Sequence, residues 1–143
     1  MALMEQAALR YLARRQRTEA NVKEYLRRVG ASPTQIRTLV RKFVERGYLN
    51  DDSYALGWAG KKLARRPMGR ARLEAELWRQ GIDRATAMRV VAQVYQEHDE
   101  RSLAQALLAR RPVLLAAGSP SRAASLLRRH GFSEETIEEL LGS

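Results

Sequence analysis

The sequence of 143 residues contains no cysteine, only two histidines and few aromatic residues. The absence of cysteine excludes disulfides, thiolate metal sites and a thiol nucleophile, and it suits a reducing cytoplasm. No apolar run approaches the roughly 20 residues that a membrane-spanning helix needs. The opening residues, MALMEQAALRYLARR, also lack the charged, apolar, small-residue order of a signal peptide. We therefore expect a cytoplasmic protein with no membrane partner.

Motifs of catalysis are equally scarce. His98 and His130 have no partner at the spacing of a metal site, and the sequence contains no glycine-rich phosphate loop, H-E-x-x-H or G-x-S-x-G. The adjacent acids Asp51 and Asp52 stand just before a predicted helix, where carboxylates cap the helix and interact favourably with its positive end. We expect this capping role rather than a metal site, and we predict no catalytic residue, no metal and no cofactor.

Acidic residues are in the minority, with 16 Asp and Glu against 26 Lys and Arg, for a formal net charge of +10 and a pI near 10.8. An excess of this size indicates an anionic partner, most often a nucleic acid. Arginine supplies 22 of the 26 basic residues. Because its planar guanidinium group binds phosphate as a fork and stacks on bases, this bias favours the same interpretation.

The chain repeats one pattern three times, at offsets of 51 and 50 residues. The repeat aligns Leu26 with Leu77 and Leu127, and it aligns three glycines in the same way: Gly30, Gly81 and Gly131. The tetrapeptide LARR occurs once per copy, at 12–15, 63–66 and 108–111. The third LARR lies 19 residues before its aligned leucine, against 14 in the other copies, so the third copy carries a five-residue insertion within 113–118.

Each copy predicts three helices and no strand. Thr18 is a suitable N-cap, Ser32 and Gln35 have the spacing of a capping box, and apolar positions recur with helical periodicity between them. Asp83 and Ser133 are equivalent caps in the later copies. The first copy should begin with a helix over 4–16, and the other predicted helices are 51–66, 69–80, 84–96, 98–111, 120–130 and 134–141.

These elements predict an all-α fold of three tandem three-helix repeats in an elongated, curved body. The expected domains are repeat 1 at 1–50, repeat 2 at 51–97 and repeat 3 at 98–143. Units of this size are marginal when isolated and gain stability by stacking on one another. We expect a monomer.

The paired arginines admit two interpretations. Each pair falls in the last turn of a predicted helix, where a cation stabilises the negative helix end by about 0.3–1 kcal/mol. Helix-end chemistry would be the same in every copy, however, and the net charge falls from +7 over 1–50 to +3 over 51–97 and zero over 98–143. The gradient therefore favours a second role, in a surface that meets phosphates or an acidic protein groove.

Two groups of cations form the predicted binding surface. The first lies near the first LARR, and the second comprises six cations within residues 61–72 with no acid between them. We expect 61–72 to be the main functional surface and the third copy, with Arg110, Arg111, Arg128 and Arg129, to contribute less charge to binding. The candidate residues are Arg10, Arg14, Arg15, Arg17, Lys61, Lys62, Arg65, Arg66, Arg70 and Arg72.

The chain does not repeat the basic DNA-recognition helix that a helix-turn-helix protein would need in each copy. The third helix of the first copy is basic, with Arg37, Arg41 and Lys42, whereas that of the third copy carries Glu134, Glu135, Glu138 and Glu139. The acidic helix would be repelled from a DNA groove. It is therefore either a solvated surface or a protein contact.

The order of motifs resembles the RecX family of bacterial recombination regulators. The residues that carry the resemblance are YLARRQRTEANVKEYL, then GYLNDDSYA at 47–55 and MGRARLEAELWRQGI, together with the triple repeat. The match is best over 7–96 and looser in the third copy. No single motif is diagnostic by itself.

The resemblance implies a partner and an activity that charge alone does not specify. RecX-family proteins bind the RecA recombinase filament on single-stranded DNA, lie along its groove, and inhibit its ATPase, strand-exchange and coprotease activities. They have no catalytic residues of their own. Two alternatives stay open: a sequence-tolerant DNA-binding protein of nucleoid type, and an enzyme, for example one that acts on RNA. Double-stranded DNA is a further candidate partner beside single-stranded DNA.

Overall fold

The computed structural model describes residues 1–112 and 120–142, and all regular structure in these ranges is helical. The predicted insertion within 113–118 lies outside the described residues. Helices are numbered along the chain: α1 (Ala2–Arg14), α2 (Glu19–Arg28), α3 (Pro33–Glu45), α4 (Asp51–Arg65), α5 (Arg70–Arg79), α6 (Arg84–Glu97), α7 (Glu100–Ala109), α9 (Pro120–Arg129) and α10 (Glu134–Leu141).

The predicted helix ends agree with these bounds to within two residues, because local capping chemistry sets most of them. The side chains of Thr18, Ser32, Asp83 and Ser133 each accept a hydrogen bond from a backbone N–H in the first turn of the helix that follows. The first helix is shifted by two residues and ends at Arg14, since Arg15 is fully extended. Asp51 and Asp52 are not the caps of α4; Asn50 fills that position, and the two acids occupy the first turn.

Each set of three helices encloses its own apolar cluster. Repeat 1 (α1–α3) buries Phe43 and Leu26, repeat 2 (α4–α6) buries Leu73 and Leu77, and repeat 3 (α7, α9 and α10) buries Leu127. The predicted all-α fold of three tandem three-helix repeats is confirmed. The leucines that the sequence repeat aligns are each fully buried in the last turn of a second helix.

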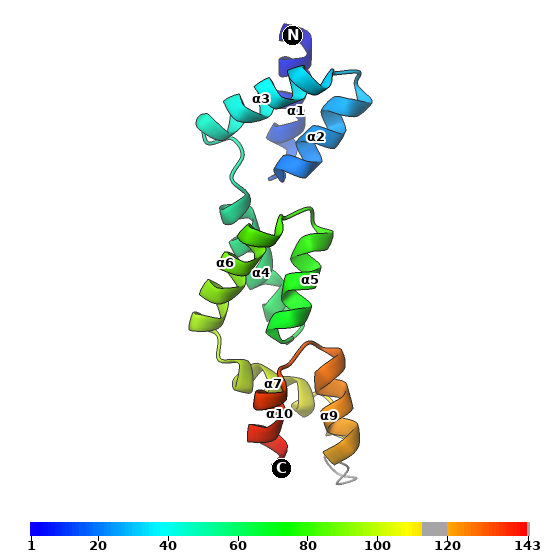
Figure 1. The fold of residues 1–143 in the computed structure, drawn as a ribbon, viewed down its shortest axis with the longest axis vertical. Helices are drawn as coiled ribbons and strands as arrows, with labels where there is room; N and C mark the ends of the chain where they lie inside the picture. Colours follow the sequence, from blue (N-terminus) through cyan, green and yellow to red (C-terminus); the bar gives the residue numbers. More distant parts are fainter. Residues whose placement is uncertain (113–119, 143) are drawn as a thin grey trace.

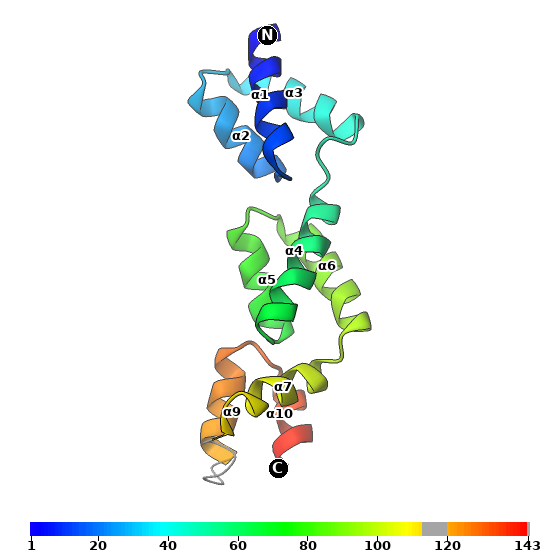
Figure 2. The ribbon, with the colours of Figure 1, turned by 180° about the vertical axis from the view of Figure 1, so that it is seen from behind.

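The repeats follow one another along an elongated body, with the N-terminus at one end and the C-terminus at the other (Figure 1). Seen from either side, the second helices α2, α5 and α9 lie one above the next along one flank (Figure 2). The body is therefore a column of three small helical units, each with its own apolar core, rather than a set of helices packed around one shared core.

Backbone hydrogen bonds join repeat 2 to repeat 3. The N–H of Gly69, at the start of α5, donates to the carbonyl of His130 over 2.8 Å, and the N–H of Ala71 donates to the carbonyl of Gly131 over 3.3 Å. A methyl group on Gly131 would lie 2.3 Å from the backbone nitrogen of Arg72, and one on Gly69 would lie 2.3 Å from the Gly131 carbonyl oxygen. The start of α5 thus rests directly on the turn that ends α9.

The junction between repeats 1 and 2 uses an acidic side chain instead. Asp51 Oδ1 accepts a hydrogen bond from the backbone N–H of Glu19, at the start of α2, over 3.0 Å. Gly81, the repeat-related counterpart of Gly131, approaches the side chain of Ala20. Burial raises the pKa of Asp51, and the neighbouring Asp83 carboxylate raises it further. Burial, followed by the charge of Asp51, likewise raises the pKa of Glu19.

Removing the Asp51 charge should stabilise this junction at neutral pH. Asp51→Asn keeps an oxygen acceptor for the Glu19 N–H, and Asp52 still complements the α4 N-terminus. Because the folded-state pKa of Asp51 is raised, ionisation weakens the folded state as pH rises through that pKa. We expect a gain in the free energy of unfolding on the order of 0.5 kcal/mol at pH 7, small because the carboxylate is partly hydrated. The gain should shrink as the pH falls toward about 4, where the acid is largely protonated in the folded state and partly protonated in the unfolded state.

Asp51→Ala is the control for this substitution. It removes the acceptor as well as the charge and should cost about 1 kcal/mol at pH 7. Urea unfolding at pH 4 and pH 7 measures both variants. A wild-type protein that is more stable than Asp51→Asn at pH 7 would contradict the prediction.

Candidate nucleic-acid interface

The LARR segments end the first helix of each repeat. Their leucines pack toward the cores, with Leu63 and Leu108 buried and Leu12 partly buried. The arginine pairs that follow, Arg14-Arg15, Arg65-Arg66 and Arg110-Arg111, are exposed and lie at or just beyond the last helical residue. The motif therefore places two cations at the end of each first helix.

One member of each predicted group lines a cleft between repeats 1 and 2. Arg15, from the end of α1, and Lys61, from α4, line this cleft of about 310 Å³ together with Trp58 and Tyr54. The ammonium group of Lys62 lies 5.5 Å from the centre of the Trp58 ring, close enough for a cation–π contact. The structure thus brings together cations from the two groups that lie 46 residues or more apart in sequence.

Arg70 and Arg72 differ from the other candidates because both engage carboxylates. Arg70 Nε lies 3.2 Å from Glu100 Oε2, and Arg72 Nε lies 3.1 Å from Glu76 Oε1. Arg72 also donates to the carbonyl oxygen of Arg129, over 3.3 Å. The acid-free run in the sequence is therefore not acid-free in space, and these two arginines help to join repeats 2 and 3.

Arg17 belongs to an aromatic stack that the sequence analysis missed. Its guanidinium carbon lies 3.8 Å from the centre of the Tyr11 ring, and Tyr11 stacks on Tyr25 with ring centres 4.3 Å apart. Arg28 lies 5.9 Å from the other tyrosine of the pair. The two tyrosines come from different helices, so no sequence periodicity pairs them.

The remaining candidates are exposed cations without a carboxylate partner. Across residues 1–112 and 120–142, no ion pair involves Arg10, Arg14 or Arg65. Arg66 lines a second cleft, between repeats 2 and 3, whose other charged groups come from repeat 3. The ten residues predicted from the sequence all lie in repeats 1 and 2, so the third-repeat residues of this cleft are not among them.

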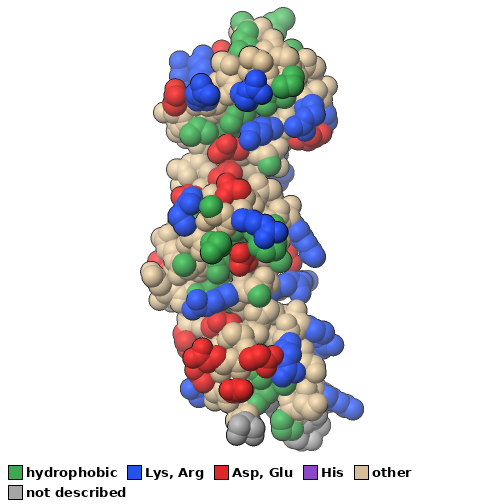
Figure 3. All heavy atoms as spheres, viewed as in Figure 1, with side chains coloured by type: hydrophobic (Ala, Val, Ile, Leu, Met, Phe, Trp, Pro, Cys, Tyr) green, Lys and Arg blue, Asp and Glu red, His purple; other side chains and the backbone are tan. Residues whose placement is uncertain are grey.

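Acidic and basic side chains occupy different parts of the surface. Acidic side chains gather over repeat 3 in the region of α10, whereas basic side chains project along the flank formed by α5 and α9 (Figure 3). Glu134 pairs with Arg128 through two hydrogen bonds, which lower the pKa of that carboxyl. The acidic face of α10 is thus partly neutralised by its own repeat.

The described residues form neither a membrane-spanning helix nor a cluster of metal ligands. No helix there is long and apolar enough to cross a membrane. No group of three or more His, Asp or Glu side chains within residues 1–112 and 120–142 is arranged to hold a metal ion.

The chain is similar in sequence to known regulatory proteins. The model of the first three-helix domain of RecX matches residues 6–43. The regulatory protein RecX of Thermobifida fusca is 31% identical over 130 residues, covering 87% of this chain and 69% of the relative. That of Amycolatopsis mediterranei is also 31% identical and covers 85% of this chain and 67% of the relative.

A solved structure shares the fold over nearly the whole length. The crystal structure of RecX from Lactobacillus salivarius superposes with a TM-score of 0.83 at 22% identity, and the match covers 98% of this chain and 93% of that one. Together with the sequence relatives, this shows that the chain belongs to the RecX family of regulatory proteins.

Proposed function

We propose that this protein binds the RecA recombinase filament on single-stranded DNA and inhibits its ATPase, strand-exchange and coprotease activities. It would act as a cytoplasmic monomer without catalytic residues or cofactor, with its repeats at 1–50, 51–97 and 98–143 as domains. The observation that carries the proposal is the recurrence of exposed arginines at the end of each first helix, beside both junctions between repeats.

A regular polyanion is the target that this arrangement suits. The second cation of the first two LARR pairs, Arg15 or Arg66, lines the cleft toward the next repeat. Cationic sites are therefore spaced by one repeat along an elongated body, as a strand or a nucleoprotein groove would require. The third helices carry opposite charge, with Arg41 on α3 and Glu138 on α10. Backbone contacts without repeated base reading predict weak sequence specificity.

A sequence-tolerant nucleoid-type protein is the second candidate, because unpaired arginines bind any DNA backbone. Titration of this protein into a RecA ATPase assay on single-stranded DNA separates the two. Inhibition well below one protein per DNA binding site supports filament modulation. Inhibition that instead follows the occupancy of free DNA supports the nucleoid-type alternative and contradicts the proposal.

A further inference from the structure

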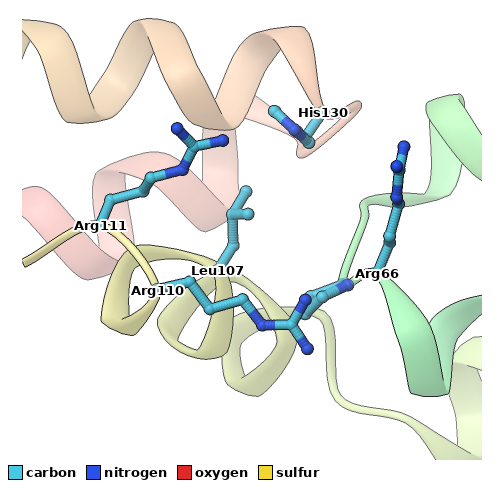
Figure 4. A pocket seen from close by; sticks show the side chains of 6 residues that line it. Arg66, Leu107, Arg110, Arg111 and His130 are labelled. Carbon is cyan, nitrogen blue, oxygen red and sulfur yellow. The ribbon is translucent and has the colours of Figure 1, made fainter.

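The cleft between repeats 2 and 3 gathers arginine and histidine side chains from three separate segments of the chain. It has a volume of about 350 Å³. Arg66 approaches from the end of α4, Arg110 and Arg111 from the end of α7, and His130 from the end of α9 (Figure 4). Leu107 lies between them. Three arginines and a histidine therefore line one open cleft.

The positive charge of this cleft is not balanced by the protein. Among residues 1–112 and 120–142, no aspartate or glutamate lines the cleft. Within the described part of the chain, Arg66, Arg110 and Arg111 form no ion pair. Nearby arginines on the same two repeats do have such partners, as Arg128 has in Glu134. Gathering like charges costs free energy unless an anion offsets it, so the cleft is suited to an external anion.

Hydrogen bonds fix two of these groups in place. Arg110 Nη1 donates to the Arg65 carbonyl oxygen over 2.9 Å, so the side chain is held across the junction. His130 Nδ1 lies 2.9 Å from the Leu126 carbonyl oxygen. Because a carbonyl only accepts, Nδ1 carries the proton in this bond, and Nε2 is the ring nitrogen left for a ligand. Nε2 donates to a phosphate oxygen only when it carries a proton as well. The His130 carbonyl in turn accepts from Gly69.

The base of the cleft is apolar. Leu107 and Pro67 are buried in it, whereas Arg66, Arg110 and Arg111 are exposed around it. An apolar base with a cationic rim suits a phosphate that carries a sugar, since the guanidinium groups bind the oxygens as planar forks while the sugar covers the aliphatic surface. Exposed arginines also permit a chain to enter and leave the site.

We infer that this cleft is a binding site for a backbone phosphate of single-stranded DNA, formed by Arg66, Arg110, Arg111 and His130. The inference rests on the proposed function, because the single strand bound here is the DNA strand on which the RecA filament assembles. It also differs from the charge-gradient expectation, because it gives repeat 3 two of the cations that contact the strand. Arg66 at this junction and Arg15 at the preceding one would then bind phosphates one repeat apart.

The two histidines provide a local readout. Proton–nitrogen correlation spectra of the imidazole rings, recorded while an oligothymidylate is added to the full-length protein, should show shifts in the His130 ring signals that follow binding. His98, an exposed residue at the end of α6, lines neither junction cleft and should shift much less. Saturated DNA binding without a shift of His130 would overturn the inference.

Arg111→Gln tests the charge without disturbing a described side-chain hydrogen bond. Loss of one phosphate contact lowers the salt slope by about 0.7 on a single strand, which is about a fivefold loss of affinity at 100 mM salt. Arg129→Gln is the matched control, because Arg129 is exposed on the adjacent helix end and does not line the cleft. It should change affinity less than about twofold. Equal effects of the two substitutions would overturn the inference.

Pyrophosphate and the recombinase assay complete the test. If pyrophosphate shifts His130 as strongly as the oligothymidylate at equal phosphate concentration, the cleft takes small anions and the inference of a strand is overturned. A wild-type protein that inhibits the RecA ATPase but shows no His130 shift with DNA refutes the inference alone. One that shows the shift without inhibiting the ATPase supports the inference and refutes the proposed function.

Discussion

A variant with Arg15, Lys61, Arg65 and Arg66 changed to glutamine should bind single-stranded DNA roughly 10²–10³-fold more weakly at 100 mM salt. The four side chains are exposed and have no ion pair in the part of the chain that the structure describes. Each lost phosphate contact should remove about 0.7 from the slope of log affinity against log salt concentration. Fluorescence anisotropy with a labelled oligothymidylate between about 50 and 200 mM salt measures both the affinity and the slope.

The control must lose the same charge from other surfaces. Changing Arg41, Arg101, Arg122 and Arg129 to glutamine lowers the formal net charge from +10 to +6, as the first variant does. All four of these arginines are exposed as well. Glutamine is a good helix former, so both variants should remain folded. If the two variants lose equal affinity, net charge alone governs binding, and the residues at the junction clefts have no special role.

Arg70 and Arg72 are left out of this variant for a structural reason. Both belong to the predicted binding group, yet the Arg70–Glu100 ion pair and the hydrogen bond from Arg72 to the Arg129 carbonyl join two repeats, and Arg72 also pairs with Glu76 within α5. Their removal would change stability and charge together. A loss of binding could not then be assigned to either cause.

The fold followed from the sequence because its determinants are local. A cap such as Ser32 sits within three residues of the backbone N–H that it satisfies. The aligned residues Leu26, Leu77 and Leu127 are each fully buried. The sequence repeat therefore identified a core residue in each three-helix unit. Helix periodicity and capping involve only a few neighbouring residues, so both could be predicted from the sequence alone.

The candidate site was harder to predict, because the residues that contact one another there are far apart in the sequence. Arg110 meets the carbonyl of a residue 45 positions earlier, and Arg70 meets a glutamate 30 positions later. Charge counting therefore overestimated the free charge of 61–72, and it could not show that Arg110 and Arg111 line the same cleft as Arg66. Which cations gather in one cleft depends on how the repeats stack, and that is set by the backbone junctions.

Gly131→Ala should be the most disruptive substitution at such a junction. The backbone of Gly131 is left-handed, with φ at 85°, which costs a residue with a side chain roughly 1–2 kcal/mol. A methyl group would also lie 2.3 Å from the backbone nitrogen of Arg72, and a backbone atom cannot move aside as a flexible side chain can. Repeat 3 must then shift against α5 and lose the hydrogen bonds from Gly69 and Ala71. We expect a total cost of roughly 3–5 kcal/mol in the free energy of unfolding.

Gly30→Ala isolates the cost of the junction from the cost of the turn. Gly30 occupies the equivalent turn in repeat 1 with φ at 93°, but nothing lies within 4 Å of the added methyl group. It should lose only the roughly 1–2 kcal/mol of the left-handed backbone. Urea unfolding followed by far-UV circular dichroism compares the two variants. Because the phosphate cleft lies across the same junction, Gly131→Ala should also weaken DNA binding while Gly30→Ala does not. Equal destabilisation by both would mean that the repeats separate without cost and that the cleft between them is not held in a fixed shape.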